Sequence, residues 1–257
     1  MTLEYATRAL VGTLTPQANT TAEPELNMLW PAGFSMITAR LTSAKPLLED
    51  RLADYYQHLD DTLLQFGNAP VQVVAAACTG SSYLIGTARQ DALFTALGRR
   101  LGVPVTNSAL AVVAALHSLQ AKRIGLVSPY PKNLTAHSLT YWSSRGFEVA
   151  AVAEPEPIKE GFHPVYAMAR PMIDTALLTL ENTTGLDAIV LLGTGAPSLG
   201  TLLRHPRVAG APVFSCNLAL AWHSIELMAP EHSPRAANLL SMIGGQGWAE
   251  VFARRQI

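Results

Sequence analysis

The chain has 257 residues, a formal net charge of −1, and 14% charged residues. At ~150 residues per domain this length allows one large domain or two small ones. So few charges, with no basic stripe and no acidic tail, argue against a nucleic-acid partner, and 49% hydrophobic residues exclude a mainly disordered chain. The only two cysteines, Cys78 and Cys216, are too few for a disulfide framework or a thiolate zinc site.

The sequence contains no targeting or membrane signal. Charged Glu4 and Arg8 interrupt the N-terminal segment, so it lacks the long apolar stretch of a secretory signal. The longest apolar stretches, such as 109–116, are far shorter than the ~20 residues of a membrane-spanning helix. We therefore expect a cytoplasmic protein with reduced thiols and no membrane contact.

Short apolar segments of strand length alternate with longer segments of helical periodicity. The expected strands are 10–14, 34–39, 71–77, 103–106, 123–127, 148–152, 188–192 and 212–215. The expected helices are 47–66, 83–101, 108–119, 134–145, 170–181 and 218–228. In 47–66, leucines and tyrosines recur every three or four residues, as on the apolar face of a surface helix. The alternation predicts an α/β fold with parallel sheets.

Two parts of the chain share nearly the same pattern. Strand 71–77 leads into Cys78-Thr-Gly80, and strand 188–192 leads into Gly193-Thr-Gly195. The pattern predicts two pseudo-symmetric lobes, each a parallel sheet flanked by helices, with the active site in the cleft where the strands' carboxyl ends meet. The alternative is that two unrelated strand-to-helix turns look alike. We expect an N-terminal lobe at 1–110, a C-terminal lobe at 111–216, and a helical region at 217–257 that packs back on the N-terminal lobe.

Cys78 is the strongest chemical signal. It ends a buried strand, and Thr79, Gly80 and Ser81 open the next helix. Free amides and the positive end of a helix favour a thiolate, lower its pKa, and bind a carboxylate or enolate oxygen. The alternative is a buried structural cysteine, but the small polar turn that follows favours a functional thiol.

Asn19 and Tyr130 also follow predicted strands. Taken alone, Asn19 is most typical of a turn or a helix cap. Tyr130 fits a donor to an anionic ligand and a half-buried turn aromatic equally well. The seven histidines have no metal-ligand spacing, and no nucleotide-binding or cofactor-binding fingerprint is present. We therefore expect neither a metal nor a cofactor.

Four stretches of the sequence resemble a known family. They are Thr15-Pro-Gln-Ala-Asn-Thr-Thr-Ala-Glu-Pro-Glu25, Ala77-Cys-Thr-Gly-Ser81, Leu126-Val-Ser-Pro-Tyr130 and Pro212-Val-Phe-Ser-Cys-Asn-Leu-Ala-Leu-Ala-Trp-His223. Over nearly its whole length the chain resembles the maleate cis-trans isomerase branch of the aspartate/glutamate racemase superfamily. The arylmalonate decarboxylases form the neighbouring branch.

The resemblance implies two pseudo-symmetric lobes, no cofactor, and a homo-oligomer. It also implies that Asn19 and Tyr130 hold substrate carboxylates and that Cys78 is the nucleophilic thiolate. One position departs from the family, because its second cysteine is replaced here by Gly193. Cys216 belongs to the next strand, where it reaches the cleft from the side or, as we favour, packs in the core. Cys216 and His163 are the candidates for a second acid or base.

We therefore expect a cofactor-independent isomerase acting on a small dicarboxylate. The Cys78 thiolate would add to the double bond, and the amides of 79–81 with Tyr130 would stabilise the enolate. The expected substrate-binding residues are Asn19, Thr79, Gly80, Ser81, Thr194 and Gly195. The alternatives are an arylmalonate-type decarboxylase with Cys78 as the single proton donor, an amino-acid or hydantoin-type racemase, and a non-catalytic dicarboxylate-binding protein.

Overall fold

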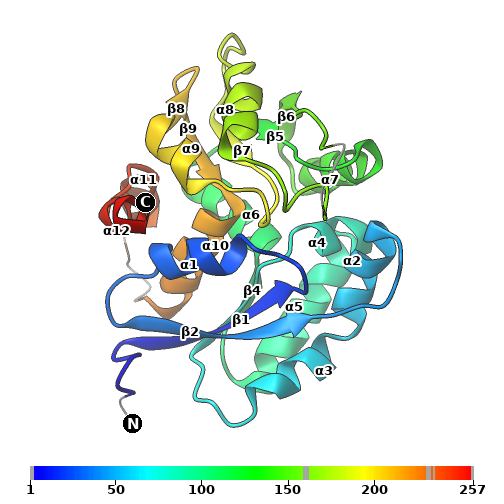
Figure 1. Cartoon of the computed structure of the whole chain (residues 1–257), viewed down its shortest axis with the longest axis vertical. Coiled ribbons are helices and arrows are strands. Elements are labelled where there is room, and N and C mark those ends of the chain that lie inside the picture. Colours follow the sequence, from blue (N-terminus) through cyan, green and yellow to red (C-terminus); the bar gives the residue numbers. More distant parts are fainter. Residues whose placement is uncertain (1–2, 159–161, 230–232, 234, 256–257) are drawn as a thin grey trace.

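The computed structural model describes residues 3–158, 162–229, 233 and 235–255. Within them the strands form two sheets, one in each half of the molecule in Figure 1. The first sheet has the order β2-β1-β3-β4, with β1 (Ala9–Pro16), β2 (Phe34–Leu41), β3 (Val73–Ala76) and β4 (Val105–Asn107). The second has the order β6-β5-β7-β9-β8, with β5 (Arg123–Val127), β6 (Glu148–Ala153), β7 (Ala188–Leu191), β8 (Arg207–Val208) and β9 (Ala211–Ser215).

The two sheets repeat one topology. Every pair is parallel except β8 with β9, and in each sheet the first strand lies between the second and the third. Leu14 pairs with Ala76 near the end of β3, and Val127 pairs with Leu191 at the end of β7. The predicted α/β fold with two pseudo-symmetric lobes is therefore confirmed. The predicted division of the chain at residue 110 stays a prediction.

Helices cover both sheets. They are α1 (Ala22–Leu29), α2 (Leu48–Gln57), α3 (Leu59–Leu63), α4 (Gly80–Ile85), α5 (Thr87–Leu101), α6 (Ser108–Ser118), α7 (Lys132–Ser144), α8 (Arg170–Leu178), α9 (Leu199–Arg204), α10 (Cys216–Met228), α11 (Arg235–Ile243), α12 (Ala249–Arg255) and the 3₁₀ helix η1 (Leu64–Phe66).

Two helix predictions were wrong in their continuity. The segment 47–66 divides into α2, α3 and η1, because His58 leaves helical geometry with φ −111° and ψ 25°. The segment 83–101 is interrupted at Gly86, which has φ +77°, a conformation that glycine adopts without strain. The first helix of this pair starts at Gly80, directly after the turn that contains Cys78.

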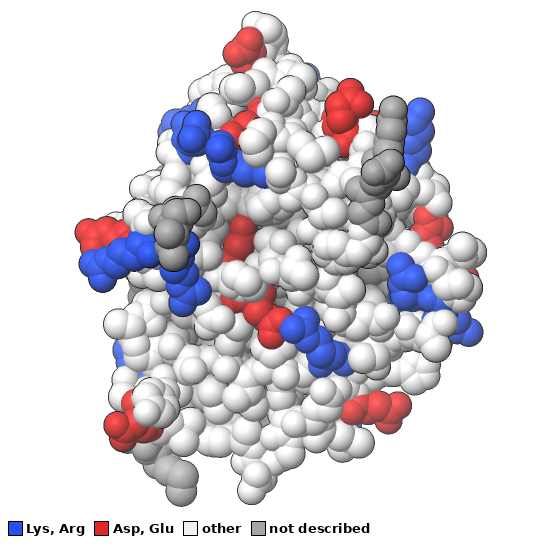
Figure 2. Space-filling view, in the orientation of Figure 1, with Lys and Arg blue, Asp and Glu red and all other residues white. Residues whose placement is uncertain are grey.

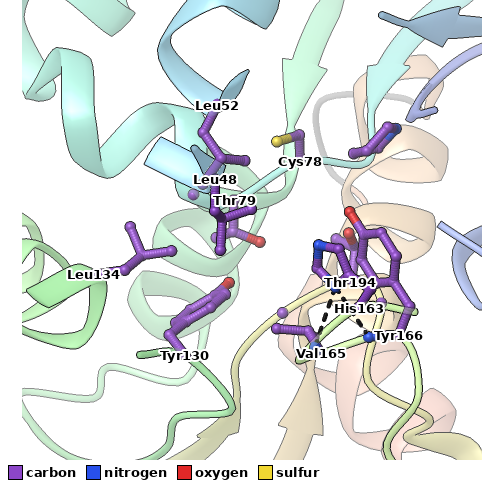
Figure 3. A pocket seen from close by; sticks show the side chains of 14 residues that line it. Leu48, Leu52, Cys78, Thr79, Tyr130, Leu134, His163, Val165, Tyr166 and Thr194 are labelled. Atoms are coloured by element: carbon purple, nitrogen blue, oxygen red, sulfur yellow. Dashed lines mark hydrogen bonds between the residues drawn. The ribbon is translucent and has the colours of Figure 1, made fainter. Parts of the chain in front are cut away.

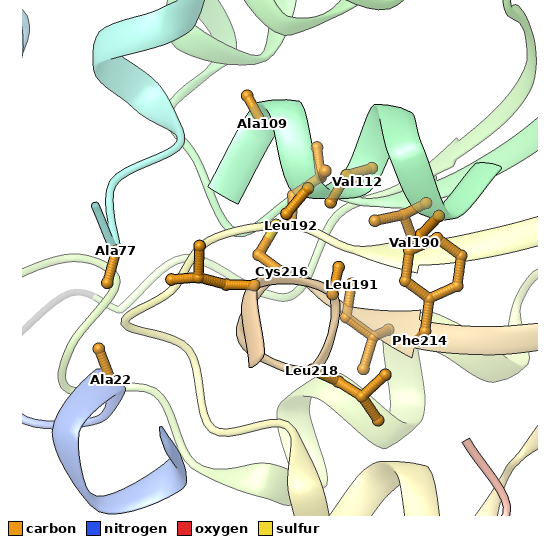
Figure 4. Packing of buried hydrophobic residues seen from close by; sticks show 14 of the residues in the cluster. Ala22, Ala77, Ala109, Val112, Val190, Leu191, Leu192, Phe214, Cys216 and Leu218 are labelled. Atoms are coloured by element: carbon orange, nitrogen blue, oxygen red, sulfur yellow. The ribbon is translucent and has the colours of Figure 1, made fainter. Parts of the chain in front are cut away.

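Helices α6 and α10 join the lobes. They pack against each other, and α10 also contacts β3 and β4 of the first sheet and β9 of the second. Figure 4 shows their buried face, where Val112 of α6 and Cys216 and Leu218 of α10 lie among apolar side chains of β7. The carboxyl ends of the two sheets are thereby held on either side of a shared core.

The surface has no single-sign charge patch on the face shown in Figure 2, where acidic and basic side chains are scattered over a largely uncharged surface. In the ranges that the structure describes, no helix is both long and apolar enough to cross a membrane.

Candidate active site

A narrow cavity lies between the two lobes at the carboxyl ends of β3, β5 and β7, and the space open to a water-sized sphere is about 30 Å³. Its polar side consists of Cys78, Thr79, Gly80, Tyr130, His163, Tyr166, Gly193, Thr194 and Gly195. Its apolar side consists of Pro16, Leu48, Leu52, Leu134 and Val165. In Figure 3, Cys78, Tyr130 and Thr194 approach the same space from different elements.

Cys78 follows β3 and is 2% exposed. Its Sγ lies 3.1 Å from Ser81 Oγ, and the Ser81 hydroxyl donates its hydrogen to the Leu52 carbonyl at 2.6 Å. Because that hydrogen is already used, the Cys78 thiol donates to Ser81 Oγ. Cys78 is therefore a neutral thiol in this arrangement. Ser81 supports the thiol from behind and is not among the residues that line the cavity.

The expectation of a lowered Cys78 pKa was wrong. Burial raises the pKa of the thiol, and this outweighs the opposite effect of the amides of Ser81 and Gly80. The six-residue helix α4 starts beside the thiol. Loss of hydration nevertheless destabilises the thiolate more than these donors stabilise it. This balance depends on burial, which the local sequence does not determine.

Two turns of free amides line the cavity. One contains Thr79, and the other contains Gly193, Thr194 and Gly195. Among the described residues, no backbone carbonyl accepts a hydrogen bond from the amides of these four residues, although the Gly193 amide faces the Cys216 thiol. The amides of Thr79, Thr194 and Gly195 therefore remain for a ligand. The Cys78 carbonyl accepts from the Tyr56 hydroxyl at 2.9 Å, which fixes the peptide that carries the Thr79 amide. Unpaired amides at such turns bind carboxylates and enolate oxygens.

Asn19 supports the second turn from behind. Its Oδ1 accepts from the amides of Thr21 at 2.9 Å and Ala22 at 3.0 Å, and its Nδ2 donates to Thr194 Oγ1 at 3.1 Å. The Thr194 hydroxyl donates to the Ala77 carbonyl at 2.8 Å, so Thr194 connects the two lobes. Asn19 thus has the turn role that its local sequence indicates, and it is absent from the cavity lining. Carboxylate binding by Asn19 stays a prediction.

Tyr130 stands beside Gly193. A β-carbon built on Gly193 would lie 3.5 Å from the Tyr130 hydroxyl oxygen and 2.9 Å from Pro129 Cγ. Gly193 also has φ +84°, a left-handed conformation that disfavours any side chain. Burial raises the pKa of Tyr130 well above its usual value, so its hydroxyl remains a hydrogen-bond donor.

Cys216 is fully buried and lies among apolar side chains (Figure 4). It is the first residue of α10 and is not among the cavity-lining residues. Burial raises the pKa of its thiol to about 11, against the opposite effect of the Thr79 hydroxyl and the Gly193 amide. Cys216 is therefore a neutral thiol packed against both turns, and its role as a second acid stays a prediction.

His163 and Tyr166 form another wall of the cavity. Nδ1 of His163 accepts from the amides of Val165 at 3.1 Å and Tyr166 at 3.3 Å, drawn as dashed lines in Figure 3. The ring proton is therefore on Nε2. Burial lowers the pKa of His163 to about 4, with a further effect from Arg51, so the imidazole is neutral near pH 7. The His163 and Tyr166 rings stack with centroids 3.6 Å apart.

Sequence analysis did not identify Tyr166 or Glu25. Tyr166 lies in an irregular segment without periodicity, so only its nearness to His163 could have indicated it. Glu25 is 5% exposed and reaches from α1 to the second lobe, where its carboxylate receives hydrogen bonds from Ser198, Leu199 and Asn217. Its only signal was its place inside the first stretch that carries the resemblance.

The fold and the cavity define a two-lobed α/β protein with a small-ligand site between its lobes. The chain belongs to the arylmalonate decarboxylase family, whose model matches residues 11–240. It is therefore an enzyme of this family. Among the described residues, no group of three or more histidine, cysteine or acidic side chains is arranged to hold a metal ion.

Several relatives of known structure or activity cover most of the chain. The maleate isomerase of Pseudomonas putida is 27% identical over 257 residues, which span 90% of this chain and 96% of that protein. A crystal structure of the P. putida maleate isomerase Iso has a TM-score of 0.77 at 25% identity, covering 91% of this chain and 99% of that one. A serine-for-cysteine variant of the Nocardia farcinica maleate cis-trans isomerase, with a covalently bound succinylcysteine intermediate, has a TM-score of 0.76 at 25% identity, covering 91% and 98%.

Proposed function

We propose that the protein is a cofactor-independent isomerase that converts a small cis-dicarboxylate, such as maleate, into its trans isomer through Cys78. The observation that carries this proposal is the Cys78 thiol placed between two turns of free amides. A dicarboxylate needs an anion-binding group at each end, and the two turns supply one in each lobe. The similarity to maleate isomerases, one of which forms a succinylcysteine intermediate, supports the same chemistry here.

The reaction starts when the Cys78 thiol gives its proton to water and the thiolate Sγ adds to one alkene carbon. The π-electron pair moves onto the second carbon and into its carboxylate, which becomes an enediolate. The amides of Thr79 and Gly195 and the Tyr130 hydroxyl stabilise the new charge. The former double bond is now single and rotates. The electron pair then returns, the C–S bond breaks, and the trans isomer leaves with the thiolate restored.

Arylmalonate-type decarboxylation is the second candidate, and two observations favour it. The apolar side of the cavity, with Leu48, Leu52 and Leu134, suits an aryl group. Cys78 is a protonated thiol in the structure, as a proton donor must be. In this reaction the bond to one carboxylate breaks, carbon dioxide leaves, and the remaining enediolate takes the Cys78 proton on carbon. Water then reprotonates the thiolate.

Two incubations of the purified protein separate these functions. Fumarate formed from maleate without an added cofactor supports the isomerase, and carbon dioxide released from an aryl-methylmalonate supports the decarboxylase. Cys78→Ser should reduce turnover more than about 10³-fold while its thermal unfolding midpoint stays close to that of the wild type. When a reaction of the wild-type protein with maleate is quenched, mass spectrometry should find a succinyl adduct on Cys78.

Each remaining outcome excludes at least one hypothesis. If neither substrate is turned over and Cys78 carries no adduct, both enzymatic functions are wrong. Binding of maleate that survives Cys78→Ser, in a protein without turnover, would indicate a dicarboxylate-binding protein. Cys216→Ala tests the neighbouring thiol, since a core role predicts that turnover is retained after correction for the folded fraction. Loss of turnover in a fully folded Cys216→Ala protein would make Cys216 the second acid.

A further inference from the structure

We propose that Glu25 is a positioning residue that holds the Thr194–Gly195 peptide in place through the side chain of Asn217, and thereby directs the Gly195 amide at the substrate. This proposal rests on the proposed function, because it assigns the Gly195 amide to the charge that develops in the reaction. Glu25 lies on α1 of the first lobe, whereas the turn that it positions follows β7 of the second lobe.

The surroundings of Glu25 consist of donors only. Oε1 accepts from the amides of Ser198 at 2.5 Å and Leu199 at 3.1 Å. Oε2 accepts from Ser198 Oγ at 2.7 Å and Asn217 Nδ2 at 2.8 Å. Burial raises the pKa of Glu25, while all these donors favour its charged form. A buried carboxylate with four donors has one orientation, so it can act as a fixed anchor.

Asn217 transmits this orientation to the cavity. Its Nδ2 carries two hydrogens, and it donates one to Glu25 Oε2 and the other to the Thr194 carbonyl at 3.0 Å. Both partners are acceptors, which also fixes the orientation of the Asn217 amide. Glu25 therefore determines where Asn217 lies, and Asn217 determines where the Thr194 carbonyl points.

The geometry of the peptide completes the connection. In a trans peptide the N–H of one residue points opposite to the C=O of the residue before it. The Thr194 carbonyl points toward Asn217, which is absent from the cavity lining, so the Gly195 amide points to the other side of the peptide. The Thr21 hydroxyl donates to the Gly195 carbonyl at 2.8 Å and fixes the next peptide. Side chains of the first lobe thus orient two successive peptides of the second.

Loss of this anchor should affect the transition state more than substrate binding. An amide that faces an enediolate interacts most strongly when the charge has developed. In Glu25→Gln, the new amide group would face donors, so Asn217 would lose its partner. We expect kcat/KM for maleate to fall about 10- to 100-fold, mostly through kcat. Asn217→Ala should give a similar fall, and the double variant should lose little more than either single variant.

Glu226→Gln provides a matched control. Glu226 is also a buried acid, 3% exposed, and its Oε1 accepts from Asn238 Nδ2 at 2.8 Å, at the far end of α10. Glu226→Gln should lower the unfolding midpoint without lowering kcat/KM. A merely structural role of Glu25 predicts instead that kinetic loss follows stability loss equally in both variants, and this result would overturn the proposal.

A measurement without turnover keeps this test separate from the proposed function. The Gly195 amide resonance of the ¹⁵N-labelled protein should move in Glu25→Gln and Asn217→Ala and stay in place in Glu226→Gln. An unchanged Gly195 resonance in both of the first two variants contradicts the positioning role, whether or not maleate is the substrate. A shifted resonance in a protein that does not turn over maleate supports the positioning role and rejects the isomerase. Asn217→Ala keeps the Glu25 carboxylate with three donors, so it serves where Glu25→Gln fails to fold.

Discussion

The ring of Tyr166 lies directly against Gly195, so closely that a β-carbon built on residue 195 would be 2.1 Å from Tyr166 Cδ1. Tyr166 stacks on its other side against His163. The glycine is therefore required by close approach, because only a residue without a side chain leaves room for the ring. The cavity wall formed by Tyr166 and His163 therefore rests on the turn that contains Gly195.

Replacing Gly195 with alanine should displace Tyr166 and disturb the turn beneath it. We expect Gly195→Ala to remain folded but to lose at least about 100-fold in kcat/KM, since misplacement by about 1 Å has effects of this size. Gly98→Ala in α5 is the control, because its β-carbon would find nothing closer than 3.6 Å. That substitution should retain activity and slightly raise stability. Wild-type kinetics in Gly195→Ala would show that Tyr166 moves aside without consequence.

A second prediction concerns Gly193, the position at which the resemblance implies a cysteine in the family. The positive φ alone should cost Gly193→Ala about 1–2 kcal/mol of unfolding free energy, and contact with Pro129 Cγ at 2.9 Å adds to this. Gly210→Ala isolates the first effect, because Gly210 has φ +79° and nothing lies within 4 Å of its β-carbon. Urea unfolding should show a larger loss for Gly193→Ala than for Gly210→Ala. Equal losses would remove the steric part of the explanation.

The sequence indicates the fold well because burial leaves a periodic trace in it. Each expected strand is present, and the central strands, such as β3 and β7, are apolar along their whole length because both faces are covered. Cys78, Tyr130 and Thr194 reach the cavity because the ends of parallel strands meet at one edge of a sheet. The helix break at His58 has no glycine or proline to mark it, so the sequence could not reveal it.

Other parts of the site depend on contacts between distant residues. Glu25 meets its partners Ser198 and Asn217 more than 170 positions along the chain, and no local pattern indicates such a pair. The protonation of Cys78 depends on how deeply the folded chain buries it. The sequence could identify the turn that carries the thiol, but the direction of the pKa change follows only from the packed structure.

The raised pKa of Cys78 gives a pH prediction for the isomerase. The nucleophile is the thiolate, so the active fraction grows as pH rises toward the thiol pKa, which burial places above its ordinary value of 9.0. We expect kcat/KM for maleate to increase through neutral pH into the alkaline range. His163, with a pKa of about 4, should add no titration near pH 7. For maleate isomerisation, a pH profile that is flat or falls between about pH 7 and 9 would contradict a thiol as the resting form. A decarboxylase that uses the thiol as its acid should instead keep its rate through neutral pH and lose it only as pH rises through the thiol pKa, above 9.0.

Stability should also depend on pH, through His223. This residue lies in α10, its Nδ1 is 3.0 Å from Thr106 Oγ1, and burial lowers its pKa to about 4, with a further effect from Arg235. The unfolded chain has an ordinary histidine pKa of about 6.5, so between these two values it binds more protons than the folded protein. The histidine therefore has no effect on the free energy of unfolding above about pH 6.5, and it lowers that free energy as pH decreases toward 4. His163 acts in the same direction.

Thermal unfolding between about pH 4 and pH 7 measures this effect. His223→Gln should flatten the fall of the unfolding midpoint at low pH, because glutamine takes up no proton in either state. The double variant with His163→Gln should flatten it further. Each variant is compared with its own midpoint at pH 7, which separates the proton effect from any loss of packing around α10. The interpretation is wrong if the double variant loses as many degrees on acidification as the wild type does.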